Sequence, residues 1–222
     1  MPRRPTRRRG TAARPTKKPR QRRAERTEAT KQRILTVAVD LFETKGFAQA
    51  TTKEIARRAK IAEGTVFNYF DTKDDIALYF FEREVDHAIE AVRANASLRK
   101  ASLEERLFAL IQCQLEYLAP HERFIWTAIV RALQPASSLG LSARAVALRQ
   151  RYLAFVEELI ADSVPSGRVN MHAWIAPHVF WMFYIGVLLF WLNDTSDGKQ
   201  RTLAFVDRSL AFGVSALRQG TL

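Results

Sequence analysis

Two short helical patterns separated by a tight turn, within residues 51–70 (TTKEIARRAKIAEGTVFNYF), constrain the fold of this chain more than any other feature. Thr51 and Glu54 have the spacing of a capping box, in which the hydroxyl accepts from the backbone near Glu54 and the carboxylate reaches back. We therefore expect a helix to start at Thr51 or Thr52. Its apolar face follows with helical spacing: Ile55, Ala56 and Ala59.

The second pattern begins at Glu63, after a turn formed by residues 60–62. Val66 and Phe70 stand four residues apart and predict a small buried face. The arrangement is typical of a helix-turn-helix, in which the first residues of the second helix point at base edges in the major groove. The residues whose chemistry suits this contact are Gly64, for close backbone approach, Thr65 and Asn68, for hydrogen bonds, and Phe67, for a thymine methyl.

The flanking segments agree with this interpretation. Residues 30–45 place apolar side chains on one helical face and end at Gly46, a residue that adopts positive φ at little cost after a helix. Downstream, Asp71 or Thr72 is positioned to cap a further helix, which carries acidic residues in its first turn.

Three segments, RILTVAVDLFETKGF, ATTKEIARRAKIAEGTVFNYF and TKDDIALYFF, together resemble the N-terminal DNA-binding domain of the TetR family of bacterial transcription regulators. The resemblance runs from about Lys31 to Phe81. It implies that Tyr69, Thr51 or Thr52, and Lys73 contact DNA phosphates. It also implies dimerisation through the C-terminal helices and a ligand-binding domain that follows the DNA-binding module.

The chain departs from the family pattern at two adjacent positions. Ala62 stands where the family often has a serine that caps the reading helix, and Glu63 stands where a neutral or basic residue is common. A carboxylate at this position would be repelled by phosphate, although it could accept a hydrogen bond from cytosine N4. The base preference of the family is therefore not transferred to this chain.

The positive charge of the chain is concentrated at its N-terminus. Residues 1–26 hold 12 of the 35 Lys and Arg residues and one of the 23 acidic residues, so the remainder carries a net charge of only +1. Four prolines and no large apolar residue after Met1 predict disorder over residues 1–27. An arm of this kind can follow phosphates or enter a minor groove, and it would steepen the salt dependence of DNA binding. A solvated tail without a role and a targeting peptide are the alternatives.

Helical periodicity continues through the rest of the chain, without alternating strand patterns or a fixed repeat. We expect a linking helix from residue 72 to about 95 and further helices over 102–119, 121–133 and 142–162. The predicted fold is all-α: an N-terminal three-helix helix-turn-helix DNA-binding domain followed by a larger helical ligand-binding and dimerisation domain. The expected boundaries are residues 1–27 for the disordered basic arm, 28–75 for the DNA-binding domain and 76–222 for the effector-binding and dimerisation domain.

Residues 174–192 (WIAPHVFWMFYIGVLLFWL) are apolar on all sides of a helix. Such a helix is buried on all sides or lies in a membrane. Pro177 and His178 within the segment, and the need of the helix-turn-helix to reach DNA, favour burial, with one face against the same subunit and another against a second copy. In residues 198–218, apolar side chains recur every three or four positions. The dimer interface predicted from both segments comprises Phe183, Gly186, Phe190, Val206, Leu210, Gly213 and Leu217. The alternative is that both helices complete a monomeric core.

An effector pocket within the C-terminal domain is implied by the resemblance. The candidate lining residues, which core packing would explain equally, are Phe108, Cys113, Tyr117, Phe124, Trp126, Phe180, Trp181 and Tyr184. Arg131 lies within an apolar stretch and is a candidate for an anionic ligand group, with an intramolecular ion pair as the alternative. Cys113 is the only cysteine and is expected to serve as a packing residue.

These observations predict a cytoplasmic, homodimeric, sequence-specific DNA-binding regulator, a repressor that recognises a palindromic operator and is released by a small apolar or amphipathic effector. We expect no cofactor, no metal site, no membrane partner and no enzymatic activity, because the four histidines lack metal-ligand spacing and no phosphate loop or nucleophile motif occurs. The sequence is compatible with repression and with activation. The alternative function is a sequence-tolerant architectural DNA-binding protein driven by the basic arm.

Overall fold

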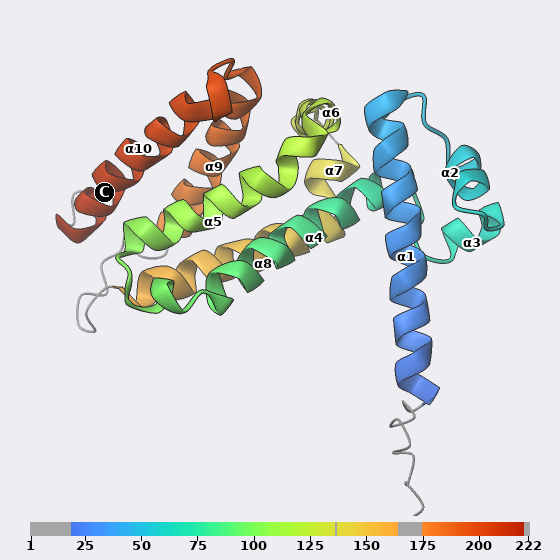
Figure 1. Cartoon of the computed structure of the whole chain (residues 1–222), viewed down its shortest axis with the longest axis horizontal. Helices are drawn as coiled ribbons and strands as arrows, with labels where there is room; N and C mark the ends of the chain where they lie inside the picture. Colours follow the sequence, from blue (N-terminus) through green and yellow to red (C-terminus); the bar gives the residue numbers. More distant parts are fainter. Residues whose placement is uncertain (1–18, 136, 164–174, 220–222) are drawn as a thin grey trace, which may run out of the picture.

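A computed structural model describes residues 19–135, 137–163 and 175–219, and every regular element in these ranges is helical. The α-helices are α1 (Pro19–Thr44), α2 (Thr52–Arg58), α3 (Glu63–Phe67), α4 (Lys73–Ala94), α5 (Leu103–Leu118), α6 (Glu122–Ala132), α7 (Ser138–Leu141), α8 (Ala143–Ala161), α9 (Ala176–Asn193) and α10 (Gln200–Gln219). Helices α1 to α3 lie at one end of the molecule and α9 and α10 at the other, with α4, α5 and α8 between them (Figure 1). The expected all-α architecture is confirmed.

The helix-turn-helix forms where the sequence predicts it. The Thr51 hydroxyl accepts a hydrogen bond from the backbone N–H of Glu54 at 3.2 Å and caps α2. The second hydrogen bond of the expected capping box, in which the Glu54 carboxylate would accept from the backbone at the cap, does not form. This part of the prediction is wrong, because the Glu54 carboxylate instead accepts from Lys45 Nζ at 2.5 Å. Ile55, Val66 and Phe70 are buried in the hydrophobic core, and α2 packs on α1 and on α3.

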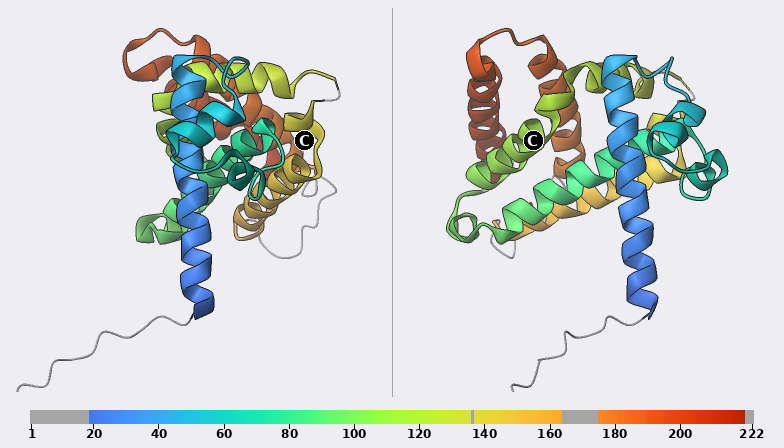
Figure 2. Two further views of the ribbon diagram at one scale, coloured as in Figure 1. Left: turned by 90° about the vertical axis from the view of Figure 1, so that its right-hand side faces the viewer. Right: turned by 45° about the vertical axis from the view of Figure 1, so that its right-hand side comes forward.

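Helix α1 begins earlier than expected. Residues 19–27 were expected within a disordered arm, whereas the structure shows them as the first turns of α1, which projects beyond the other helices (Figure 2). The physical reason is the composition of this stretch, since Arg, Gln, Ala and Glu are good helix formers that extend an existing helix without a new nucleus. The rest of the predicted arm, residues 1–18, lies outside the described residues.

Helix α4 connects the two halves of the molecule. The Thr72 hydroxyl accepts from the backbone N–H of Asp75, and the Asp75 carboxylate accepts from the backbone N–H of Thr72, so the predicted cap forms as a complete capping box. The helix packs on α1 near its start and on α5 and α8 along its length. A displacement of α4 would therefore change helix packing in both domains.

The helices of the C-terminal half follow the predicted segments within a few residues. Ser102 and Glu105 form the expected capping box at the start of α5. Helix α7 was not predicted, because four residues show no usable periodicity. The expected chain break at residues 165–167 lies outside the described residues.

Helix α9 has one buried side and one exposed side. Phe180, Tyr184, Leu188 and Trp191 are buried, while Val179, Met182, Gly186 and Phe190 are exposed. Its length and composition would also suit a membrane span, which is weak evidence because core helices pass the same test. Helices α8 and α10 pack against α9 and cover its buried side.

The apolar seam of α10 has a different partner from the one predicted. Val206 and Leu210 were expected at a dimer interface, but they are 1% and 5% exposed, and α10 packs on α5 of the same chain. The seam of an amphipathic helix shows that an apolar partner exists, and periodicity alone does not distinguish a partner in the same chain from a second copy. The exposed large apolar residues of α10 are Phe205 and Phe212.

Candidate nucleic-acid interface and effector cavity

Helix α3 exposes most of its side chains and is anchored in the core by buried apolar residues. Val66 and Phe70 are 0% and 2% exposed and fix the helix, whereas Phe67 is 46% exposed. Of the residues predicted to contact DNA, Thr51, Gly64, Phe67 and Asn68 are exposed, and Thr52, Thr65 and Tyr69 are partly exposed. The structure thus places hydroxyl, amide and aromatic groups from α3 and from the start of α2 on the surface of one small domain.

Lys73 is used differently from what the resemblance implies. Its ammonium donates to the backbone carbonyls of Phe47, Ala48 and Ala50 and lies over the Phe47 ring. Burial, followed by repulsion from Arg131, lowers the pKa of Lys73. All three donors are therefore engaged in holding the loop between α1 and α2. The structure gives this lysine a role in the loop instead of a free phosphate contact.

The described part of the basic segment adds cations at the start of α1. Arg20, Arg22, Arg23 and Arg26 are all exposed on the projecting end of the helix. These side chains are long and solvated, so they can approach phosphates without loss of core packing.

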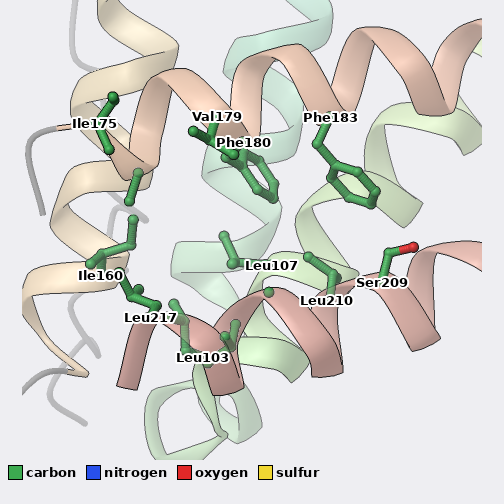
Figure 3. A pocket seen from close by; sticks show the side chains of 13 residues that line it. Leu103, Leu107, Ile160, Ile175, Val179, Phe180, Phe183, Ser209, Leu210 and Leu217 are labelled. Atoms are coloured by element: carbon green, nitrogen blue, oxygen red, sulfur yellow. The ribbon is translucent and has the colours of Figure 1, made fainter. Parts of the chain in front are cut away.

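An apolar cavity of about 180 Å³ lies between α5, α9, α10 and the end of α8. Side chains of α9 face those of α5 and α10 across it (Figure 3). Its lining consists of Leu103, Leu107, Ile160, Ile175, Ala176, Val179, Phe180, Phe183, Ser209, Leu210, Gly213, Val214 and Leu217. Ser209 is the one polar side chain in this set. A cavity of such composition suits a hydrocarbon group.

The predicted pocket residues are dispersed over the domain. Phe180 lines this cavity, Tyr117 lines a separate polar cleft between α1 and α4, and Phe124 and Tyr184 are core residues. Trp126 is 47% exposed. The remaining candidates, Phe108, Cys113 and Trp181, are partly buried against the core, and desolvation raises the pKa of the Cys113 thiol.

Several residues that line this cavity were predicted from the sequence to lie at the dimer interface. Leu210, Gly213 and Leu217 of α10, together with Phe183 of α9, line the cavity. Gly213 is the residue from which the cavity could have been predicted, because a glycine on the apolar face of a helix leaves space beside its neighbours. A Cβ added at Gly213 would meet no atom within 4 Å.

Arg106 lies on α5 one residue before the cavity residue Leu107. Its guanidinium donates to Ser163 Oγ and, at 3.4 Å, to the Leu159 carbonyl at the end of α8. Asp162 is 3.6 Å away and largely exposed, and Arg106 Nε has no hydrogen-bond partner among the described residues. One guanidinium nitrogen of Arg106 is therefore unpartnered among the described residues, and the next residue of α5, Leu107, lines the cavity.

A second polar group is buried in the core of the C-terminal domain. Glu84 of α4 is 2% exposed and accepts a hydrogen bond from the Tyr184 hydroxyl at 3.4 Å. Beside it, the Tyr152 hydroxyl donates to Gln114 Oε1 at 2.9 Å. Desolvation raises the pKa of Glu84 to about 8, and interactions with Gln114 and Tyr184 oppose the shift. The carboxyl is thus protonated at neutral pH and joins helices α4 and α9.

Helix α6 connects the regulatory half to the DNA-binding half at both of its ends. At its start, the Glu43 carboxylate of α1 accepts from the backbone N–H of Phe124 at 2.8 Å. At its other end, Arg131 donates two bonds of 3.2 Å to the carboxylate of Asp74, a buried residue in the first turn of α4. The anionic partner of Arg131 is Asp74, which is the intramolecular ion pair given as the alternative to a ligand contact.

Known proteins resemble both halves of the chain. Residues 34–80 match the family model described as bacterial regulatory proteins, tetR family, and residues 106–222 match the model of the tetracyclin repressor-like C-terminal domain. Among curated relatives, the fatty acid metabolism regulator protein of Bacillus subtilis (strain 168) is 27% identical over 138 residues, which are 62% of this chain and 69% of the relative.

Solved structures show the same fold. The transcriptional regulator FadR from Bacillus subtilis, in complex with stearoyl-CoA, is 21% identical with a TM-score of 0.66, and the match covers 82% of this chain and 98% of that one. Thermus thermophilus FadR, a transcriptional repressor in complex with lauroyl-CoA, is 21% identical with a TM-score of 0.61, over 86% and 95% of the two chains. At these identities the likeness concerns the fold alone.

Proposed function

We propose that this chain, which belongs to the TetR family of bacterial transcription regulators, is a cytoplasmic homodimeric repressor that binds a palindromic operator and is released by an acyl-type amphipathic effector. The observation that carries the DNA-binding part is the exposed surface of α3. Its reading residues are exposed or partly exposed, whereas Val66 of α3 and Phe70, three residues after the end of the helix, are buried in the core.

Specific recognition requires polar groups whose hydrogen bonds are not already satisfied within the protein. Thr65 and Asn68 on α3 are available for base edges, and Phe67 for a thymine methyl. Tyr69 and Thr51 are positioned by the same domain and would contact phosphates, whereas the Thr52 hydroxyl already donates to Glu63. These contacts would orient α3 in the major groove.

Dimerisation is supported by the exposed side of α9. Val179, Met182, Gly186 and Phe190 form an apolar stripe with helical spacing, and the Phe190 ring stacks on Phe205 of α10 at 5.2 Å. Gly186 has open space beside it, which permits a second helix to approach closely. A two-fold dimer presents two identical reading helices, and its operator is then palindromic.

The effector proposal rests on the cavity and on the ligands named for two structures of the same fold. Both FadR structures were solved with acyl-CoA molecules. The cavity of about 180 Å³ is of the size that accommodates a benzene-sized apolar group, so it would hold a short segment of an acyl chain, and a longer chain requires the helices around it to separate.

The anionic end of such a ligand would lie beside Arg106. A carboxylate or phosphate there would gain a charge-assisted hydrogen bond from a guanidinium whose carboxylate partner, Asp162, is exposed and readily displaced. The ligand would then contact α5, α9 and α10 with its tail and the end of α8 with its head.

Release of DNA follows if the ligand prefers a dimer geometry that does not fit successive major grooves. Separation of α5 from α10 would shift α4, which packs on α5. The displacement would reach the DNA-binding domain through α4 and through α6, which is bonded to Glu43 at one end and Asp74 at the other.

Selection of fragmented genomic DNA by the purified protein at physiological salt tests the proposal. We expect enrichment of one palindromic motif, its loss in Tyr69→Ala, and its retention at lower affinity in a variant that lacks residues 1–18. Uniform recovery of all fragments that disappears with the arm would instead support the sequence-tolerant architectural function, which the +11 charge of residues 1–26 favours.

A further inference from the structure

An acidic side chain lies in the middle of the DNA-facing surface. Glu63 is the first residue of α3 and is exposed. Its Oε1 atom accepts a hydrogen bond of 3.2 Å from the Thr52 hydroxyl at the start of α2. Among the described residues, no Lys or Arg nitrogen lies within 4.0 Å of its carboxylate. The charge of Glu63 is thus held in place and left unneutralised.

Two other acidic residues of the same domain form ion pairs. Glu54 is paired with Lys45 at 2.5 Å, and Asp40 is paired with Arg58 at 2.6 Å. Glu63 also contributes nothing to capping α3, because Ala62 occupies the cap position and has no side-chain hydrogen bond. A free carboxylate opposite DNA weakens binding through phosphate repulsion unless it accepts a hydrogen bond from a base.

We propose that Glu63 is a specificity-determining residue that reads one cytosine in each half-site, with Thr52 as the residue that positions it. The inference rests on the proposed function, since it assumes that α3 enters the major groove. Only cytosine N4 and adenine N6 donate hydrogen bonds there, and the adenine amine is flanked by the N7 acceptor, which repels a carboxylate. Guanine presents O6 and N7, and thymine presents O4, so both oppose a carboxylate.

The bond to Thr52 makes this contact selective. It occupies one lone pair of Oε1 and restricts the carboxylate, so that Oε2 stays available for the base. Because Thr52 belongs to α2 and Glu63 to α3, the contact also fixes the carboxylate relative to the turn between the two helices. A mobile glutamate in the same place would lose more rotamer entropy on binding and would discriminate less.

Selection from a random pool of duplexes tests the inference with the full-length wild type, Glu63→Gln, Thr52→Val and Thr52→Ser. The wild type is expected to prefer cytosine about tenfold or more at one position of each half-site. Glu63→Gln should lose this preference, or exchange it for adenine, while the other positions of the motif stay unchanged. Thr52→Val should weaken the preference at the same position, and Thr52→Ser, which keeps the hydroxyl, should restore it.

An unchanged motif in Glu63→Gln, with all duplexes bound uniformly more tightly, would overturn the inference, because Glu63 would then act only as a repulsive charge. The proposed function would survive that outcome. Failure of the wild type to enrich any motif would instead contradict the proposed function, and the assignment of Glu63 with it.

Discussion

Two glycines of the DNA-binding domain meet different physical demands. Gly46 follows α1 with a φ of +96°, a conformation that residues with a Cβ rarely adopt. Gly64 in α3 has no such conformation, and a Cβ added there would meet no atom within 4 Å. The fold therefore does not require a glycine at position 64, and the proposed approach of DNA to α3 would account for it.

Gly64→Ala is expected to keep or slightly raise stability, by about 0.5 kcal/mol, because alanine is the better helix former. Operator affinity should fall at least tenfold, since the methyl group occupies the space into which the DNA would approach. Chemical denaturation and fluorescence titration with the selected operator measure the two effects. Unchanged operator affinity would remove Gly64 from the interface.

The buried carboxyl of Glu84 gives a pH dependence whose sign follows from its pKa of about 8. Between pH 4.5, the ordinary pKa of glutamate, and pH 8, the folded protein retains this proton and the unfolded chain releases it. The free energy of unfolding therefore falls as pH rises through this window, by a total on the order of 4 kcal/mol.

Glu84→Gln keeps the shape and the neutral charge of the protonated side chain. The variant and the wild type should have equal stability near pH 4.5, and the variant should become increasingly the more stable toward pH 8. Urea denaturation across this range gives the comparison. Tyr152 and Tyr184, whose pKa values burial raises well above the ordinary value, do not ionise in this window. Parallel pH profiles would show that Glu84 is ionised in the folded protein.

At the level of elements, local sequence patterns predicted where helices start. They did not predict side-chain contacts between residues that are distant in sequence. The caps at Thr51, Thr72 and Ser102 were predictable because each involves residues three positions apart. The bonds of Lys73 to the loop before α2, and of Arg131 to Asp74, join residues 23 to 57 positions apart, so no local pattern identifies them.

The same limit explains why only one of the predicted pocket residues, Phe180, lines the cavity. Periodicity correctly located the apolar faces of α5 and α10, but an apolar face shows only that something apolar covers it. The relative placement of α10 and α5 is set by packing between helices that are distant in sequence, and this placement makes Leu210 and Gly213 line the cavity.

Arg131→Met tests the contact between α6 and α4. The change leaves the buried Asp74 carboxylate with Ser138 as its remaining side-chain partner. Because the Arg131 side chain is 45% exposed, the loss should be about 1–3 kcal/mol, less than for a fully buried pair. Urea denaturation provides the value. The double variant with Asp74→Asn should lose less than Arg131→Met alone, and equal losses would show that the pair is not coupled.

For the whole molecule, dimerisation is required for a palindromic operator. Gly186→Leu adds a side chain to the exposed stripe of α9, where the chain itself leaves open space. We expect a folded protein whose dimer dissociation constant rises at least tenfold, measured by sedimentation equilibrium, with Ala94→Leu at an exposed position of α4 as the control. An unchanged dissociation constant would mean that the copies associate through a different surface.

The central claim is that an apolar ligand in the cavity between α5, α9 and α10 and the operator are alternative partners of one dimer. The most direct test is titration of the operator-bound protein with acyl-CoA molecules of increasing chain length, for the wild type and for Gly213→Leu, which fills the cavity. We predict release of DNA from the wild type, no release from Gly213→Leu at equal operator affinity, and tighter ligand binding to the free dimer than to the DNA-bound dimer. Equal ligand affinity for the free and DNA-bound dimer would contradict the account.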